Sequence, residues 1–296
     1  MNMDARRDKW SSWLQSGRYG GDENVRLQAV EFLHDVRDRV LQGAALSGDE
    51  VLLDIGTGEG LIGLGALSLL QPPHGHVIFT DISQACLDRV ARSIAEQPRA
   101  VASSFHRLSA DSLAGIGAES VDVVTSRSVL IYVKDKQRAF DEFFRVLRHD
   151  GRLSLAEPIN RDRMQLSKAR DEYYGYDVAP IADLMARIKA ADDAIDPDND
   201  PMTDFSYLDL VEMCEDAGFT ESHIAVRCDV TKRKPRAWDS FIGFAPNPNA
   251  RTIGEELQAF FSRDELTTVE SHLRPLVESG TGAEHRIMVY VSALKR

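Results

Sequence analysis

Cysteine is scarce in this chain: its 296 residues include three cysteines, Cys86, Cys214 and Cys228, which lie far apart in the sequence. Their spacing matches no metal-ligand motif, so we expect reduced, mostly packed thiols and no bound metal. Long apolar runs are also missing, and none approaches the roughly 20 residues that span a membrane. The opening segment MNMDARR lacks the apolar region of a secretory signal. Together these absences predict a cytoplasmic protein without a membrane partner.

Positive charge is in deficit, because 35 Lys and Arg stand against 47 Asp and Glu and the formal net charge is -12. Phosphate contacts supply most of the nonspecific affinity of proteins for nucleic acid, so this balance disfavours a nucleic-acid partner. The basic run KRKPR at residues 232–236 is a local exception. We interpret it as a solvated loop, with an RNA contact or the binding of an acidic peptide as the alternatives.

The most informative segment is VLLDIGTGEG at residues 51–60, an apolar run that ends at an acid and continues into alternating glycines. An uninterrupted apolar run is typical of a buried parallel strand, and glycines after it allow a tight turn and close approach to a ligand. Helix formers follow at residues 61–70, so a nucleoside-type ligand is expected at this strand-to-helix turn. A second apolar run, at residues 76–80, ends at Asp81, whose carboxylate is positioned to accept both hydroxyls of a ribose.

The spacing of the glycines distinguishes two cofactor classes. Gly58, Gly60 and Gly63 fit the Gly-x-Gly-x-x-Gly pattern of dinucleotide-binding proteins, which is a weak signal by itself. However, the glycine that directly follows the strand is Gly56, and Asp54 precedes it. The pattern Asp-x-Gly-x-Gly-x-Gly therefore fits better than the dinucleotide motif, and it favours a nucleoside cofactor that has no phosphate to bind.

Downstream segments continue the alternation of strands and helices. They are a polar turn at residues 109–112, strands at 121–125 and 152–158, and an amphipathic helix at 139–147 that ends at Asp150 and Gly151. Together with the glycine turn, these segments resemble the motifs of the class I, Rossmann-like S-adenosylmethionine (SAM) methyltransferases across about residues 50–160.

The resemblance implies an α/β fold, a Rossmann-like doubly wound sheet with an antiparallel last strand, and SAM as the cofactor. In that family the first acid serves the amino-acid end of the cofactor. An acid in the later polar turn accepts a hydrogen bond from the adenine amino group, beside a small residue. The residues thereby assigned to the cofactor are Asp54, Gly56, Thr57, Gly58, Gly60, Asp81, Ile82, Ala110, Asp111 and Arg127.

The rest of the chain is predicted to be added to this core, which at 43% hydrophobic residues can be large. The expected parts are a helical element over the cofactor pocket (residues 1–46), the SAM-binding core (47–158), a lid insertion (159–203) and the end of the sheet with a second helical insertion at about 232–283 (204–296). The expected helices lie at residues 25–42, near 179–190, at 206–217 and at 263–277, and one further helix ends at residue 261. The expected strands lie at residues 222–230 and 286–294. The acidic loop at 192–201 lacks the glycine and closing Glu of an EF-hand, so we interpret it as solvated.

Missing sequence motifs exclude several classes of acceptor for the methyl group. Enzymes that methylate the amino groups of nucleobases carry Asn/Asp-Pro-Pro-Tyr/Phe after the fourth strand, whereas this chain has SRSV at residues 126–129. Methylation of a ring carbon through an adduct needs a placed Cys nucleophile, and arsenite methylation needs clustered thiols. Neither pattern is present in the sequence. Transfer to oxygen, or to nitrogen or carbon of a small molecule or peptide, remains.

Three further segments, at residues 127–136, 157–161 and 272–280, resemble a subgroup of bacterial tailoring methyltransferases. That subgroup includes enzymes that methylate the C-terminal carboxylate of ribosomally made peptides. The resemblance implies an enzyme of natural product biosynthesis and peptide modification, an O-methyltransferase of EC class 2.1.1 with a peptide or small-molecule substrate. The residues expected to bind the substrate are Trp13, Arg18, Tyr19, Tyr132, Glu157, Asn160 and Arg161.

No catalytic residue is assigned, because a carboxylate acceptor is ionised at neutral pH and needs no general base. A phenol or alcohol acceptor would need one, and His34, His106 and His149 are the candidates. N- or C-methylation of a small metabolite, a non-catalytic SAM-binding regulator and, as a less favoured alternative, an NAD-dependent oxidoreductase remain open. The oligomeric state is open as well.

Overall fold

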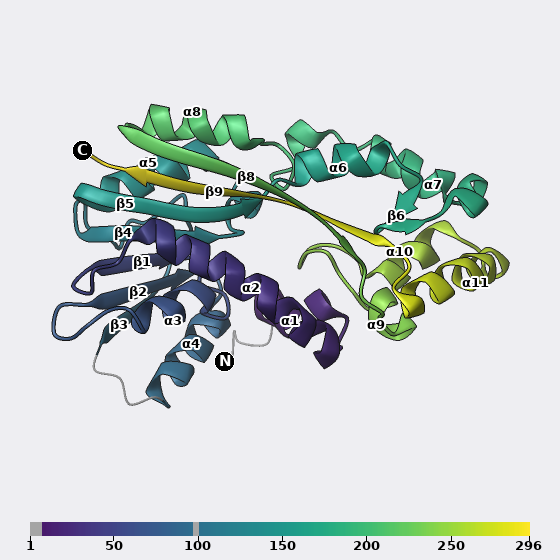
Figure 1. Cartoon of the computed structure of the whole chain (residues 1–296), viewed down its shortest axis with the longest axis horizontal. Coiled ribbons are helices and arrows are strands. Elements are labelled where there is room, and N and C mark those ends of the chain that lie inside the picture. Colours follow the sequence, from purple (N-terminus) through teal and green to yellow (C-terminus); the bar gives the residue numbers. More distant parts are fainter. Residues whose placement is uncertain (1–7, 97–100) are drawn as a thin grey trace, which may run out of the picture. The chain divides into compact units, whose positions relative to one another are not determined.

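The computed structural model describes residues 8–96 and 101–296. The chain forms two compact units, each built from three separate segments. The sheet unit consists of Val30–Ile159, Asp200–Arg227 and Met288–Arg296. The helical unit consists of the N-terminal residues through Ala29, together with Asn160–Asn199 and Cys228–Ile287. Figure 1 labels the elements of both.

A seven-stranded sheet with the order β3-β2-β1-β4-β5-β9-β8 dominates the sheet unit. Its strands are β1 (Val51–Ile55), β2 (His76–Asp81), β3 (Ala102–Arg107), β4 (Val121–Arg127), β5 (Leu147–Pro158), β8 (Glu221–Lys232) and β9 (Ala283–Leu294). Strands β1 to β5 pair in parallel, and β9 pairs with β5 in the antiparallel direction. The predicted Rossmann-like α/β fold with an antiparallel last strand is therefore confirmed.

The apolar runs of the sequence form the centre of this sheet. In β1 the residues from Leu52 to Ile55 are buried, as expected for a parallel strand covered on both faces. The strand β3 had no such signal, because its sequence ASSFHR is half polar and its residues are half-buried or exposed. It lies at the edge of the sheet, where one side is left without a neighbouring strand.

Helices pack against the sheet through a shared apolar core. They are α2 (Glu23–Ala44), α3 (Leu61–Leu67), α4 (Gln84–Ala95), α5 (Lys136–Val146) and α8 (Tyr207–Ala217). Val36 of α2, Ile62 of α3 and Val90 of α4 meet Leu52 and Phe79 of the strands in one cluster. Helix α5 packs on β5 and on α8. These contacts fix the carboxyl ends of the strands, where the glycine turn lies.

The end of α5 differs from the expectation. The helix ends at Val146 and β5 begins at Leu147, so Asp150 and Gly151 lie in the strand and do not end the helix. The ammonium of Lys295 explains this, because its Nζ donates to the carbonyl oxygens of Phe144 and Leu147 at 2.8 and 2.7 Å. A cation that follows β9 thus satisfies carbonyls that a C-terminal glycine would otherwise serve.

The helical unit has an apolar core of its own. Its elements are α1 (Lys9–Gln15), η1 (Gly17–Tyr19), α6 (Asn160–Lys168), β6 (Glu172–Tyr173), β7 (Tyr176–Asp177), η3 (Ala179–Ile181), α7 (Ala182–Asp193), η4 (Pro197–Asn199), α9 (Trp238–Ile242), α10 (Ile253–Phe260) and α11 (Arg263–Ser279). Aromatic and aliphatic residues from both predicted insertions, such as Tyr176, Met185, Phe241 and Leu273, form one buried cluster. The two segments treated separately in the sequence thus share a core.

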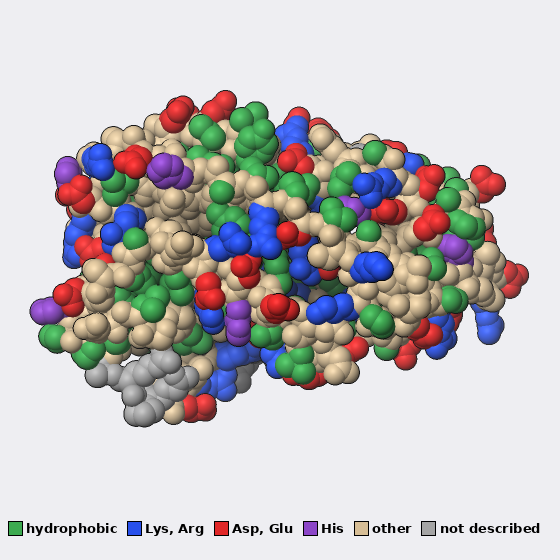
Figure 2. Space-filling view, in the orientation of Figure 1, with side chains coloured by type: hydrophobic (Ala, Val, Ile, Leu, Met, Phe, Trp, Pro, Cys, Tyr) green, Lys and Arg blue, Asp and Glu red, His purple; other side chains and the backbone are tan. Residues whose placement is uncertain are grey.

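Across residues 8–96 and 101–296, no helix is long and apolar enough to cross a membrane. Figure 2 shows Asp and Glu side chains scattered among Lys and Arg on the face in view. No group of three or more His, Cys, Asp and Glu in the described segments is arranged to hold a metal ion.

Candidate functional site

The glycine turn joins β1 to α3 in a conformation that requires glycine. Its left-handed residues are Gly56, Gly58 and Gly60, with φ of +62°, +54° and +85°. A Cβ atom at Gly56 would lie 2.3 Å from Cγ2 of Val129, well inside van der Waals contact. The N–H of Thr57 donates to the carbonyl of Thr80 at 2.9 Å, which ties the turn to the end of β2. The backbone here has the shape expected for close approach to a ligand.

Asp54 is buried beneath this turn. Its Oδ2 accepts from the N–H of Gly63 at 3.1 Å, and its Oδ1 accepts from the hydroxyl of Thr125 at 3.1 Å. Burial raises the pKa of Asp54 to about 6, although these hydrogen bonds lower it in part. The carboxylate thus joins β1 to α3 and β4. A direct role at the amino-acid end of the cofactor stays a prediction.

Asp81 is fixed beside the glycine turn. Its Oδ2 accepts from the N–H of Gly58 at 2.8 Å, and its Oδ1 accepts from the N–H of Ser83 at 2.8 Å. Ser83 was not expected from the sequence as a site residue, yet its hydroxyl accepts from the N–H of Cys86 and caps α4. The signal was available, because Ser before a helix is a preferred N-cap. An ionised carboxylate has about four lone-pair sites, so each oxygen of Asp81 retains acceptor capacity for a ribose hydroxyl.

The residues expected near adenine follow Asp81 and β3. Ile82 is 45% exposed, a large apolar side chain that the fold leaves uncovered. The Nε of Arg107 donates to the Ile82 carbonyl at 2.9 Å and holds it against the end of β3. Ala110 is buried, and Asp111 accepts from the hydroxyl of Ser109 in a tight turn. The structure therefore places an apolar surface next to Asp81 and an acid in the following turn.

The comparisons with known proteins agree with this geometry. The model of a methyltransferase domain family matches residues 53–155. SAM is the methyl donor of this class of domain. Residues 53–155 are a SAM-dependent methyltransferase domain of class I. The crystal structure of BH2331 from Bacillus halodurans C-125 shares its fold, with a TM-score of 0.54 and 17% identity over 88% of this chain and 99% of that one.

Two curated relatives match only a part of this chain. Arsenite methyltransferases from Halobacterium salinarum and Mus musculus are 31% identical over 116 residues and 33% identical over 114 residues. These matches cover 39% and 36% of this chain but only 29% and 30% of the relatives. The chain thus spans about 30% of the length of the relatives it matches, which corresponds in extent to a single domain.

The residues of the methyltransferase domain fit SAM. The uncovered Ile82 offers an apolar surface for the adenine ring, and Asp81 beside it has acceptor capacity for the ribose. The left-handed glycines bring backbone rather than side chains to the ligand. The role of each residue toward the cofactor stays a prediction, but the arrangement matches the chemistry of a nucleoside.

Near the carboxyl end of β5, Glu157 contacts the segment that follows β4. Its side chain is completely buried, and its Oε1 accepts from the N–H of Val129 at 2.9 Å. Oε2 of Glu157 makes no hydrogen bond within the described segments. Ser128 has a left-handed φ of +54°, a strained conformation for a residue other than glycine. Glu157 therefore organises the start of the turn η2 (Leu130–Tyr132).

Arg127, assigned to the cofactor from the sequence, and Tyr132, assigned to the substrate, flank this turn. Arg127 is the last residue of β4, and its positive charge lowers the pKa of Glu157. Burial is the larger effect and raises the pKa of Glu157 to about 7. Tyr132 is the half-buried last residue of η2. The domain thus brings Arg127, Tyr132 and Glu157 to the ends of two adjacent strands.

We expect Glu157→Gln to remove a pH dependence from the stability of the protein. Because the folded-state pKa of about 7 exceeds the ordinary value of 4.5, the native state binds the proton more tightly than the unfolded state. Stability from this group is present below pH 4.5 and is lost as pH rises through 7. Between pH 5 and pH 8 the wild-type free energy of unfolding should fall by about 2 to 3 kcal/mol more than that of the variant. Urea unfolding at several pH values measures this difference.

Glu50 provides a matched control. Burial raises its pKa, but hydrogen bonds from Ser47 and Gly48 outweigh that effect and lower it to about 2. Its stabilising contribution is present above pH 4.5 and is lost only as pH falls toward 2, so Glu50→Gln should be destabilised uniformly from pH 5 to pH 8. Parallel pH profiles for wild type and Glu157→Gln would contradict the assignment.

The remaining predicted substrate residues lie in the helical unit. The indole of Trp13 donates to the carbonyl of Ala245 at 2.8 Å, and Tyr19 is buried. The Arg18 guanidinium lies 5.6 Å from the ring centroid of Trp13. Asn160 begins α6, and the next residue, Arg161, forms an ion pair with Asp198 at 2.7 Å. These contacts show how the residues pack, while their roles toward a substrate stay predictions.

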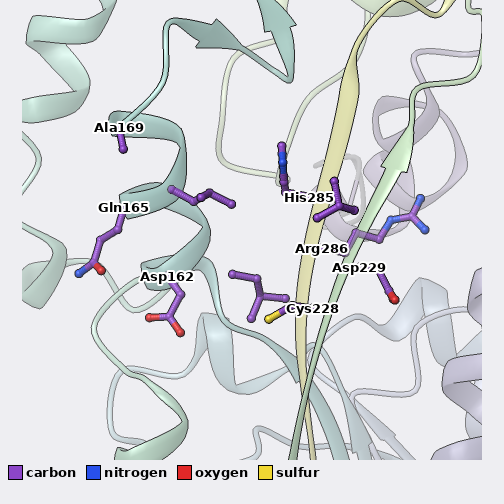
Figure 3. Close-up of a pocket in the computed structure, with 10 residues that line it drawn as sticks. Asp162, Gln165, Ala169, Cys228, Asp229, His285 and Arg286 are labelled. Carbon is purple, nitrogen blue, oxygen red and sulfur yellow. The ribbon is translucent and has the colours of Figure 1, made fainter.

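A groove of about 500 Å³ also lies in the helical unit. Figure 3 shows Asp162 and Gln165 of α6 and the following Ala169 on one side, and Cys228 of β8 and His285 of β9 on the other. None of the substrate residues expected from the sequence lines it.

Proposed function

We propose that this protein is a SAM-dependent methyltransferase that transfers a methyl group to an oxygen atom, with a carboxylate of a peptide or small natural product as the favoured acceptor. The observation that carries the methyltransferase assignment is the joint position of Gly58 and Asp81. Their 2.8 Å hydrogen bond couples the glycine turn to the carboxylate that we expect to bind the ribose, inside the matched domain.

The segment after β4 supports an oxygen acceptor over the amino group of a nucleobase. Amino-methylating enzymes place Asn/Asp-Pro-Pro-Tyr/Phe there. In this chain Ser128 takes a left-handed conformation instead, and its N–H donates to the carbonyl of Ala156 at 2.9 Å. Val129 then donates to Glu157. The local structure is thus organised by a buried carboxylate and offers no Asn or Asp side chain at the position of that motif.

The cysteines disfavour transfer through a thiolate. Cys86 and Cys214 are buried, and burial raises the pKa of Cys214 to about 12. Such a thiol stays protonated and is a poor nucleophile. Cys228 is exposed on β8, and it follows the buried Cys214 by 14 residues. Arsenite is nevertheless the second candidate acceptor, because two relatives of the domain are arsenite methyltransferases.

The proposed reaction demands little acid-base chemistry from the chain. SAM supplies an electrophilic methyl group on a sulfonium. With SAM bound, an ionised carboxylate oxygen would take this methyl group while sulfur leaves, which would give a methyl ester and S-adenosylhomocysteine without a proton transfer. The chain must therefore bind the methyl donor and the acceptor, align them and exclude water from the site.

Arg127 is the favoured residue to orient an acceptor carboxylate. Arg127 stands at the carboxyl end of β4, on the edge where the domain binds its cofactor. Its guanidinium can form charge-assisted hydrogen bonds with a carboxylate.

The nature of the acceptor can be tested by the stability of the product. The protein is incubated with methyl-labelled SAM and the peptide and small-molecule fraction of a bacterial extract. We expect labelled product that releases nearly all of its label as methanol on brief treatment with mild alkali, because methyl esters hydrolyse there and methyl ethers and methylamines do not. Protein carrying Asp81→Ala serves as the control for transfer.

Each other result has a defined meaning. Alkali-stable label would contradict the carboxylate and favour N- or C-methylation or an ether. Labelled methylarsenicals on addition of arsenite would favour the second candidate. Tight SAM binding without transfer to any acceptor would favour a non-catalytic regulator, and binding of NAD in place of SAM would contradict the methyltransferase.

A further inference from the structure

The basic run at residues 232–236 has two different sides. Lys232 and Lys234 are exposed, whereas Arg233 and Arg236 are half-buried within the helical unit. Arg236 donates from Nε to the hydroxyl of Ser240 at 2.8 Å and from Nη2 to its carbonyl at 2.7 Å. A solvated loop would not hold two arginines in this way. The run therefore contributes two cations to the packed part of the unit.

Arg233 lies against an aromatic ring and is weakly paired. Its guanidinium is 5.6 Å from the ring centroid of Tyr176. The nearest acid, Glu284, is 3.9 Å from Nη1 of Arg233 and closer to Arg286, at 2.6 Å. The Nε of Arg233 is buried and makes no hydrogen bond in the described segments. Much of the hydrogen-bonding capacity of this guanidinium is thus unused.

A third arginine, Arg163 of α6, joins them. It lies within electrostatic range of Tyr174, Arg233 and Glu284. Within residues 8–96 and 101–296, Arg163 makes no hydrogen bond or ion pair. The Arg163 side chain is exposed, so a ligand in solution can reach its guanidinium. Burial lowers the pKa of Arg236 to about 10.

Like charges gathered within electrostatic range of one another destabilise a fold unless an anion joins them. Glu284 supplies one negative charge, shared with Arg286, and Asp22 lies near Arg236. Guanidinium groups bind carboxylates through planar, paired hydrogen bonds. The ring of Tyr176 lies against Arg233, and Tyr174 lies within electrostatic range of Arg163.

We propose that Arg163, Arg233 and Arg236 form an anion-binding site that takes a carboxylate of the peptide acceptor. The site deepens the proposed function and rests on it for the identity of the acceptor. It assigns a function to the basic run that the net charge of the chain does not predict. The proposal does not depend on which atom of that acceptor receives the methyl group.

A binding experiment with the full-length protein tests the site. The probe is a fluorescein-labelled hexaglutamate peptide followed by fluorescence anisotropy, with hexaglutamine as the neutral counterpart. Arg163→Gln and Arg233→Gln should each raise the Kd for hexaglutamate at least about tenfold, because each removes a charge-assisted contact. Lys232→Gln and Lys234→Gln remove the same charge from the exposed side of the same run, and each should change the Kd less than about twofold.

Several results would overturn the proposal. They are the absence of hexaglutamate binding to wild type, equal losses in the Lys and Arg variants, or equal binding of hexaglutamine. Stronger competition by inorganic phosphate than by acetate would overturn the assignment to a carboxylate. Arg163→Gln removes no hydrogen bond or ion pair within the described chain, so this variant should unfold at the wild-type temperature or above. If Arg233→Gln does not fold, the measurement on Arg163→Gln alone tests the site.

The outcome is independent of the cofactor site. SAM affinity, titrated in the same variants, should stay within about twofold of wild type, because all three arginines lie outside the matched domain. Failure of wild type to bind SAM would contradict the proposed function while leaving the peptide measurement interpretable. Normal SAM binding together with equal binding of hexaglutamate and hexaglutamine would contradict only the anion site.

Discussion

Asp81→Ala should lower the affinity for SAM by about a hundredfold or more. The substitution removes both oxygens expected to accept the ribose hydroxyls, and hydrogen bonds to a charged acceptor contribute about 1.5 to 3 kcal/mol each. It also removes the partners of the Gly58 and Ser83 N–H groups, which lie 2.8 Å from the carboxylate. Calorimetric titration with SAM and with S-adenosylhomocysteine measures the loss.

Two variants separate ribose binding from a general effect on the fold. Asp81→Asn retains one acceptor oxygen, so its affinity should lie between those of wild type and Asp81→Ala. Asp88→Ala removes an exposed acid of α4, whose Oδ1 accepts from the side chain of Gln84 one turn earlier at 2.8 Å, and it should bind SAM normally. A change of less than about threefold in Asp81→Ala would refute the ribose assignment.

Gly56→Ala should destabilise the sheet unit by about 3 kcal/mol and abolish measurable SAM binding. A left-handed φ of +62° costs an L-residue about 1 to 2 kcal/mol. Overpacking adds about 1 to 3 kcal/mol, since the new Cβ would lie 2.3 Å from Cγ2 of Val129. Urea unfolding and calorimetric titration measure the two effects.

The chain offers a matched control and a rescue for this prediction. Gly21 has a similar φ of +71°, and a Cβ atom there would have no neighbour within 4 Å, so Gly21→Ala should lose only about 1 to 2 kcal/mol. Val129→Ala removes the clashing methyl groups and should restore part of the stability of Gly56→Ala. Equal losses at Gly56 and Gly21, or no rescue by Val129→Ala, would show that the close approach is unimportant.

The sequence predicts the strands and the glycine turn of the core sheet well because their signals are local. The apolar run at 51–55, the glycines after it and the acid at Asp81 lie within about 30 residues, and the backbone directions of parallel strands bring them together. The helix ends follow the same rule, because Ser262 and Gly218 cap their helices and a cap depends on residues within one turn.

The helical unit is predicted less well because its structure depends on contacts distant in sequence. Trp13 bonds to Ala245, and the hydroxyl of Tyr173 donates to Glu256. No local sequence pattern predicts that the segment that ends at Ala29 and the two insertions form one unit. The inward side of the basic run is hidden for the same reason, because Arg233 and Arg236 are distinguished from Lys232 and Lys234 only by what packs around them.

The position of β9 constrains the order in which the protein can fold during synthesis. It is the last strand along the chain, yet it lies between β5 and β8 in the sheet. When β8 has left the ribosome, the strand that must separate it from β5 is still more than 50 residues from completion. Until then the edge of β5 is open to pairing with the wrong partner, a hazard that chaperones counter. Vectorial folding can therefore build β1 to β5 early, but the sheet closes only after nearly all of the chain has emerged.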